Sequence, residues 1–188
     1  RILAAAARHL EKEAPARPRG LAAVSFAVGP AVLAVDAGAP IDFVVAIGGY
    51  YDLEAAIAFF TTGKFRTDPG EPWRHREPNA YGKWVFVLSN VPRIEDVNDR
   101  RLLREMAYRR LEDLDADIAP LVAAFGPEGR AVHALLVNTD PERVPALLDR
   151  LPQGLRAEIE ALDLADLDFD GWDRRAIATR FVLIHGTD

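Results

Sequence analysis

The fold is decided by the stretch LAAVSFAVGPAVLAVDAGAPIDFVVAI, which occupies residues 21–47. Residues 21–26 form a short apolar run that is typical of a buried strand. Small residues from Gly29 onward predict a helix, and residues 36–40 predict a turn. Residues 41–47 are rich in β-branched side chains, which indicates a second buried strand. A strand, a helix and a second strand in this order predict a βαβ unit, and hence a parallel sheet covered by helices.

The rest of the chain adds one strand and many helices. Residues 2–12 carry their apolar side chains on one face and predict a helix. Residues 180–185 have the sequence RFVLIH and predict a third buried strand. Residues 103–125 show apolar residues at helical spacing, which predicts one long helix bent near Pro120. The run at residues 81–88 fits a strand or a helix equally well.

Three further segments complete this interpretation. Residues 66–82 are polar and rich in Pro and Gly, so we expect a loop there. Asp140 followed by Pro141 predicts the start of a helix, because Asp is a preferred N-cap and Pro suits the first helical position. We therefore expect an α/β fold with three parts. These are a core sheet part at residues 1–52, a mostly helical insertion at residues 53–175 and a returning core strand at residues 176–188.

Composition excludes several classes of protein. The 188 residues suit one domain, and 49% of them are hydrophobic, so wholesale disorder is not expected. The net charge of −6 argues against a nucleic-acid partner. There are no cysteines, which excludes disulfides, thiolate metal ligands and a cysteine nucleophile. No apolar run approaches the roughly 18 residues that span a bilayer. We expect a cytoplasmic protein, since cysteine and a visible targeting segment are both lacking.

A serine stands where the first strand meets the helix. Ser25 ends the apolar run and is followed at once by small residues that begin a helix. A nucleophile elbow requires this context, because a sharp strand-to-helix turn lifts the serine hydroxyl above the sheet. The next N–H then faces the oxyanion that develops during attack on a carbonyl. The residues two before and two after the serine must be small, and here they are Ala23 and Ala27.

The chain resembles the α/β-hydrolase family, in particular bacterial serine hydrolases with a helical cap. The resemblance is carried by AVSFAVGPAVLAV around Ser25, by FVVAIGGYYDL at residues 43–53, by the cap-like helices and by FVLIHGTD at residues 181–188. It implies an α/β-hydrolase-type parallel sheet with a helical cap. It also implies that Ser25 is the nucleophile and that the Phe26 N–H is an oxyanion donor. Neither a cofactor nor a metal is implied. The sequence departs from the family pattern Gly-x-Ser-x-Gly, because alanines occupy both glycine places.

The resemblance also indicates where the other catalytic groups would lie. The family acid commonly follows an HG-x-x-D pattern, and Asp188 is the best acid within the chain, although it lies one residue short of that register. Asp52 is a second candidate, with helix N-capping as the alternative role. His185 ends a strand, where a structural role is usual. We expect the histidine base and the second oxyanion donor outside this chain, whose native termini would extend further at both ends.

None of the other three histidines is expected to be the base. His9 lies on the surface of the first predicted helix, and His75 lies in the polar loop. His133 falls in an apolar helical pattern, where local burial is the usual explanation. Ligand spacing for a metal is also lacking. The run from Asp166 to Gly171 matches only the first half of a calcium loop, because Ile177 stands where the bidentate Glu is needed.

Two functions from different classes fit these observations. The first is a serine hydrolase that cleaves an ester, thioester or related acyl bond of a small-molecule substrate. The second is a non-catalytic protein of α/β-hydrolase-like fold that binds a ligand or a partner, which the two glycine-to-alanine departures favour. Aromatic residues after the second strand and after the polar loop are Tyr50, Tyr51, Phe59, Phe60, Tyr81, Trp84 and Phe86. They indicate either an apolar substrate pocket or ordinary core packing. The oligomeric state is left open.

Overall fold

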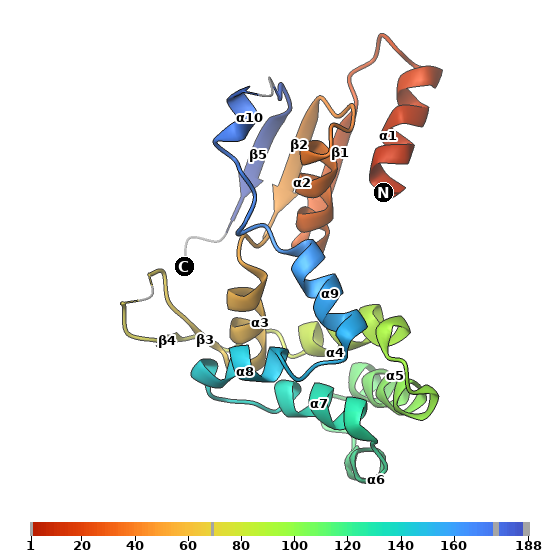
Figure 1. The fold of residues 1–188 in the computed structure, drawn as a ribbon, viewed down its shortest axis with the longest axis vertical. Coiled ribbons are helices and arrows are strands. Elements are labelled where there is room, and N and C mark those ends of the chain that lie inside the picture. Colours follow the sequence, from red (N-terminus) through yellow and green to blue (C-terminus); the bar gives the residue numbers. More distant parts are fainter. Residues whose placement is uncertain (1, 69, 175–176, 186–188) are drawn as a thin grey trace. The chain divides into compact units, whose positions relative to one another are not determined.

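The computed structural model describes residues 2–68, 70–174 and 177–185. These residues divide into two compact units, which Figure 1 draws as a ribbon. Unit 1 comprises residues up to Leu53 together with the segment that begins at Leu162. Unit 2 comprises Glu54–Ala161. The protein is therefore of mixed α/β type, with a small parallel sheet in unit 1 and an almost wholly helical unit 2.

The sheet of unit 1 has three parallel strands in the order β1-β2-β5. They are β1 (Gly20–Val24), β2 (Phe43–Ile47) and β5 (Arg180–Ile184). In the register of the sheet, Ala46 faces Ala23 on one side and Leu183 on the other. All three strands predicted from the sequence are confirmed, and so is the parallel βαβ connection between the first two. Their β-branched and small apolar residues suit a pleated, buried surface.

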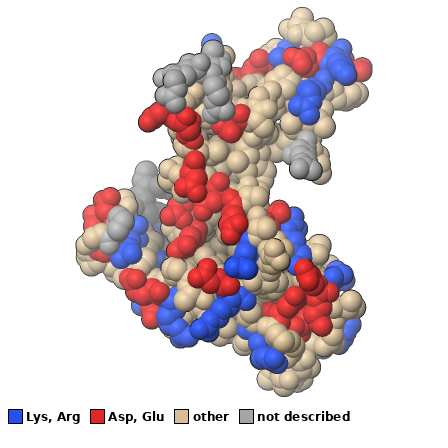
Figure 2. Space-filling model, viewed as in Figure 1, with Lys and Arg blue, Asp and Glu red and all other residues tan. Residues whose placement is uncertain are grey.

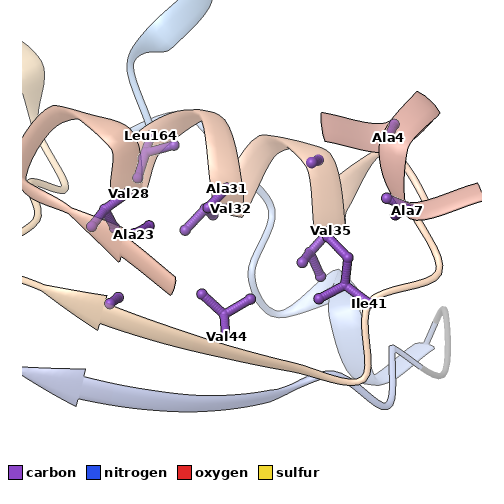
Figure 3. Packing of buried hydrophobic residues seen from close by; sticks show 13 residues of the cluster. Ala4, Ala7, Ala23, Val28, Ala31, Val32, Val35, Ile41, Val44 and Leu164 are labelled. Carbon is purple, nitrogen blue, oxygen red and sulfur yellow. The ribbon is translucent and has the colours of Figure 1, made fainter. Parts of the chain in front are cut away.

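The helices α1 (Ile2–Glu13) and α2 (Val28–Asp36) belong to the same unit. The buried residues of α2 pack on one face of the sheet, against side chains such as Ala23 and Val44, as Figure 3 shows. Two alanines of α1, Ala4 and Ala7, join this cluster. Small residues predominate, so the backbones of helix and strand approach closely. This packing fixes the junction between β1 and α2 relative to the sheet.

The opposite face of the sheet carries apolar side chains that are exposed in the structure. Val24, Val182 and Ile184 are exposed by 59%, 51% and 50%, respectively. Successive strand residues point to opposite faces, so these side chains lie across the sheet from Ala23 and Leu183. One face of the sheet thus contributes to the core of unit 1, and the other is an exposed apolar surface.

Unit 2 is built from short helices and one two-stranded hairpin. The principal helices are α3 (Leu53–Thr62), α4 (Tyr81–Asn90), α5 (Val97–Glu112), α7 (Pro127–Leu136) and α9 (Gln153–Leu162). The shorter ones are η2 (Val91–Arg93), α6 (Ala119–Ala123), η3 (Pro141–Arg143) and α8 (Val144–Leu148). The ambiguous run at residues 81–88 therefore belongs to helix α4. The predicted start at Asp140 is confirmed, since its carboxylate accepts a hydrogen bond from the Glu142 N–H.

The prediction of one bent helix over residues 103–125 is wrong. Helix α5 ends at Glu112, and α6 begins only at Ala119. The intervening segment holds Asp113, Asp115 and Asp117. The first and last of these accept hydrogen bonds from the backbone N–H two residues later, at 2.9 Å in both cases. Such local bonds compete with helix formation. Pro120 consequently lies in the first turn of a new helix and does not bend an old one.

Helices α5 and α7 cap one another. The buried Asp99 of α5 accepts hydrogen bonds from the N–H groups of Gly126 and Gly129, at 2.6 and 2.8 Å. Glu128, in the first turn of α7, accepts hydrogen bonds in return from the N–H groups of Glu95 and Asp96, at 2.9 and 3.0 Å. Each helix thereby accepts hydrogen bonds from N–H groups at the amino-terminal end of the other helix, where those groups have no intrahelical partner. The two carboxylates also place negative charge at the positive, amino-terminal ends of both helices.

A small hairpin involves the polar loop predicted at residues 66–82: β3 (Lys64–Phe65) lies just before the loop and pairs with β4 (Arg74–His75) inside it. The Arg66 guanidinium lies 4.2 Å from the centre of the Trp73 ring. Both side chains also contact Glu142: Arg66 in an ion pair at 3.5 Å and Trp73 through its indole N–H at 2.9 Å. The basic and aromatic residues of this loop are thus tied to a carboxylate of η3. Figure 2 shows both signs of charge interspersed on the visible face.

Candidate active site

Ser25 occupies a sharp turn between β1 and α2. Its φ is +54°, and among the described residues it is the sole non-glycine with a positive φ. The preceding Val24 is still extended, with φ −124° and ψ 136°. Residues Ser25–Ala27 then form a single 3₁₀ turn, in which the Ser25 carbonyl accepts a hydrogen bond from the Val28 N–H. The chain therefore changes from strand to helix at this one serine.

This conformation costs energy and exposes the hydroxyl. A left-handed backbone brings the Cβ of an L-residue close to the following carbonyl oxygen, at a cost of roughly 1–2 kcal/mol. Ser25 is exposed, and its hydroxyl makes no hydrogen bond to any described residue. Strained residues of this kind concentrate at functional sites, where the surrounding structure holds them in place. Ser25 thus combines a left-handed backbone with an exposed side chain at the end of a strand.

Close packing around the elbow falls at two glycines. A Cβ placed on Gly29 would lie 1.9 Å from the Tyr50 hydroxyl oxygen, and one placed on Gly49 would lie 2.6 Å from Val28. Ala23 is buried and Ala27 is exposed, and both are accommodated. The first turn of α2 is thus pressed against the loop that follows β2. The tight contact lies at Gly29 and Gly49 and not at the two alanines.

Tyr50 holds this loop against the elbow. Its ring lies 5.8 Å from the Phe26 ring, and its hydroxyl donates a 2.9 Å hydrogen bond to the Leu162 carbonyl. Burial, with the nearby Asp163 carboxylate as a second cause, raises the pKa of Tyr50 to about 12. The neutral hydroxyl is therefore strongly favoured. In the sequence, Tyr50 is one of several aromatic residues, and the Gly-Gly-Tyr-Tyr run after a strand is the signal that marks it.

The carboxyl ends of the three strands share one edge of the sheet. Ser25 follows β1, Gly48 and Gly49 follow β2, and His185 follows β5. The Gly48 N–H donates to the Ile184 carbonyl at 2.9 Å, and the His185 Nε2 lies 3.1 Å from the Gly49 carbonyl oxygen. In open α/β sheets, ligands bind outside this edge. His185 thus lies at the same edge as Ser25, with one ring nitrogen at hydrogen-bonding distance from a backbone carbonyl.

The remaining candidate residues lie in several places. Asp188, the acid predicted from the sequence, lies outside the described residues. Asp52 is exposed and immediately precedes α3, whose first N–H, that of Leu53, lies 3.4 Å from the Asp163 carboxylate. His9 is exposed on α1, and His75 is exposed in the hairpin.

His133 lies on α7, with its ring 6.0 Å from that of Phe125. Burial lowers the pKa of His133 below its ordinary value. In unit 2, the rings of Phe60 and Phe86 pack against one another in a tilted arrangement with ring centres 5.3 Å apart, and both side chains are buried. These two residues of the aromatic group therefore belong to the core of unit 2.

The described residues of unit 1 line at least two hollows. One, of about 440 Å³, lies on the α2 face of the sheet and is lined in part by Tyr50 and Tyr51. A larger one, of about 860 Å³, lies at the opposite, amino-terminal edge and holds the Arg19–Asp42 ion pair, with 3.3 Å between the charged atoms. The larger hollow contains none of the candidate residues, whereas the smaller one is lined in part by Val28 of α2, by Gly49 and by His185.

Metal-ligating residues do not gather anywhere in residues 2–68, 70–174 and 177–185, where no group of three or more suitable side chains occurs. In the acidic run, Asp168 accepts a 2.7 Å hydrogen bond from the Gly171 N–H at the start of α10 (Gly171–Arg174).

Within the same described ranges, no helix combines the length and apolar character that a membrane crossing requires. No protein-family model, curated protein or solved structure matches the chain.

Proposed function

We propose that this protein is a serine hydrolase of the α/β-hydrolase type, acting on an ester, thioester or related acyl bond. The observation that carries the proposal is the left-handed Ser25 at the junction of a parallel strand and a helix. A strand-end serine with a purely structural role would not need a strained backbone. The parallel order β1-β2-β5, with unit 2 inserted between the last two strands, further supports the proposal.

In the proposed reaction, Ser25 Oγ attacks the carbonyl carbon of the acyl substrate. The Oγ–C bond forms as the hydroxyl proton passes to a general base, and the carbonyl oxygen becomes an oxyanion. The Phe26 N–H, at the start of the turn into α2, is the proposed donor to that oxyanion, and the positive end of the helix favours the charge. The leaving group departs with the proton, and water then hydrolyses the acyl-enzyme.

The general base is a histidine in our proposal, and Asp188 is the acid that orients it. Among the described residues, no histidine is hydrogen-bonded to Ser25.

Fluorophosphonate labelling tests the proposal directly, because the reagent modifies activated serines. The chain has a built-in control, since its only other serine is Ser89, which is exposed on α4. We expect one adduct on the peptide that contains Ser25, complete loss of labelling in Ser25→Ala and unchanged labelling in Ser89→Ala. A folded protein that stays unlabelled, or that labels equally in Ser25→Ala, rejects the serine hydrolase.

The rival function is a binding protein of the same fold that performs no chemistry. Ala23 and Ala27, at positions where the family has glycine, favour this rival. It predicts that the protein is not labelled even though Ser25 keeps its left-handed backbone. Labelling at Ser25 therefore separates the two functions.

A further inference from the structure

The 440 Å³ hollow in unit 1 is enclosed by parts of the chain that are distant in sequence. Its walls come from α2, from β2 and the loop that follows it, from the segment before β5 and from β5 itself. Among the lining residues are Val32, Ala46, Tyr51, Phe169, Trp172 and Leu183. The volume is within the range of small-molecule sites, which is roughly 300–1,000 Å³.

The polar groups of the lining aromatics are already bonded to other parts of unit 1. The Tyr50 hydroxyl donates to the Leu162 carbonyl, as described above, and the Tyr51 hydroxyl donates to the Ala165 carbonyl at 3.0 Å. The Trp172 indole N–H donates to the Asp36 carboxylate at 2.9 Å. These side chains therefore offer the hollow mainly their ring carbons. A ligand that needs many hydrogen bonds would lose those it makes to water and gain few in return.

Four of the aromatic rings form a continuous row along the hollow. The ring centres are 6.1 Å apart for Tyr51 and Phe169, 5.0 Å for Phe169 and Trp172, and 5.5 Å for Trp172 and Phe181. All three pairs are tilted, a geometry that presents both ring faces and ring edges. An aromatic or alicyclic ligand can pack against such a wall in offset or edge-to-face contact.

The walls still expose apolar surface to water. Leu183 is 74% exposed and Phe169 is 38% exposed, although both line the hollow. Covering this surface with hydrocarbon is favourable by about 25 cal/mol for each Å² removed from water. A peptide segment is a poor occupant, because every residue carries an N–H and a C=O that must be bonded when buried.

We propose that this hollow is a binding site for a small, uncharged, mainly hydrocarbon molecule with an aromatic or alicyclic ring system. Ser25 is not among the residues that line the hollow, so the proposal does not depend on the chemistry assigned to it. Size, apolar walls and the row of rings all point to the same class of ligand. The single ionisable side chain among the described lining residues, apart from the two tyrosines, is that of His185 at the edge of the hollow.

The test uses N-phenyl-1-naphthylamine, an uncharged fluorescent probe of this chemical class. In a Trp73→Phe/Trp84→Phe background, Trp172 is the only tryptophan left, so energy transfer to the probe reports proximity to the hollow. We expect saturable binding of one probe per chain with efficient transfer. Ser25→Ala should bind equally well, which separates this test from that of the proposed hydrolase.

Two neighbouring residues of β5 provide matched variants. Leu183 lines the hollow, whereas Val182 points to the exposed opposite face of the sheet, and both are largely exposed. Leu183→Asp should weaken probe binding by about tenfold or more, since it places a charge against the ligand. Val182→Asp should change binding by less than about twofold. Weakening by Val182→Asp alone would place the probe on the exposed sheet face and overturn the proposal. Absence of saturable binding to the folded protein would overturn it as well.

Discussion

The strained backbone of Ser25 can be measured by comparing glycine and alanine at two positions. Both Ser25→Gly and Ser25→Ala remove the hydroxyl, so the difference between them reports the backbone alone. Ala27, two residues later, is the control, because it is also exposed but has ordinary helical angles, φ −69° and ψ −15°. Ala27→Gly compared with the unchanged chain provides the same glycine–alanine difference without left-handed strain.

The expected magnitudes follow from these angles. At residue 27, glycine should lower the free energy of unfolding by about 0.5–1 kcal/mol relative to alanine, since glycine loses more chain entropy on folding. At residue 25, alanine should bear roughly 1–2 kcal/mol of left-handed strain that glycine does not. Glycine should therefore be the more stable residue there, by up to about 1.5 kcal/mol after its entropy cost is subtracted. The sign of the effect reverses within two residues.

Urea unfolding followed by Trp172 fluorescence is the appropriate assay. With Trp73 and Trp84 replaced by phenylalanine, the signal comes from unit 1 alone, where Ser25 lies. The slope of free energy against urea concentration should be the same in all variants, so that midpoints compare stability directly. If glycine is the less stable residue at both positions, the backbone of residue 25 is not left-handed. The elbow and the proposed hydrolase would then both be rejected.

Two further predictions concern other parts of the chain. Asp99→Asn should destabilise unit 2 by about 2–4 kcal/mol, because one of two charge-assisted hydrogen bonds is lost and an amide N–H₂ then faces a backbone N–H. The exposed Asp115→Asn is the control. Equal thermal unfolding midpoints for Asp99→Asn and Asp115→Asn would refute the reciprocal capping. The absorbance near 295 nm that is lost in Tyr50→Phe should titrate with a midpoint near the pKa of about 12, and a midpoint near the ordinary tyrosine value of 10.0 would show that burial does not perturb the half-buried Tyr50. Because the pKa of Tyr50 is higher in the folded state than in the unfolded one, its contribution to stability is complete below pH 10 and is lost as pH rises through 12.

Much of unit 1 could be predicted from short segments. The β-branched run at residues 41–47 and the small-residue helix before it required only local pattern, and the position of Ser25 between strand and helix followed from them. Unit 2 was harder. Apolar spacing over residues 103–125 continued across the Asp-rich segment, although those aspartates bond their own backbone and end the helix. Periodicity records which side chains are buried, and it does not record whether the backbone between them stays helical.

The sequence by itself determined the local order of strand, serine turn, helix and strand, because steric preference and burial act over a few neighbouring residues. The tertiary structure alone decided that Tyr50 packs on Gly29 and bonds Leu162, which is 112 positions away in the chain. It alone brought Asp99 to the amide groups of Gly126 and Gly129, and Trp172 to Asp36. Such pairings depend on how separate elements meet in three dimensions, and no local pattern specifies which distant group will complete a hydrogen bond.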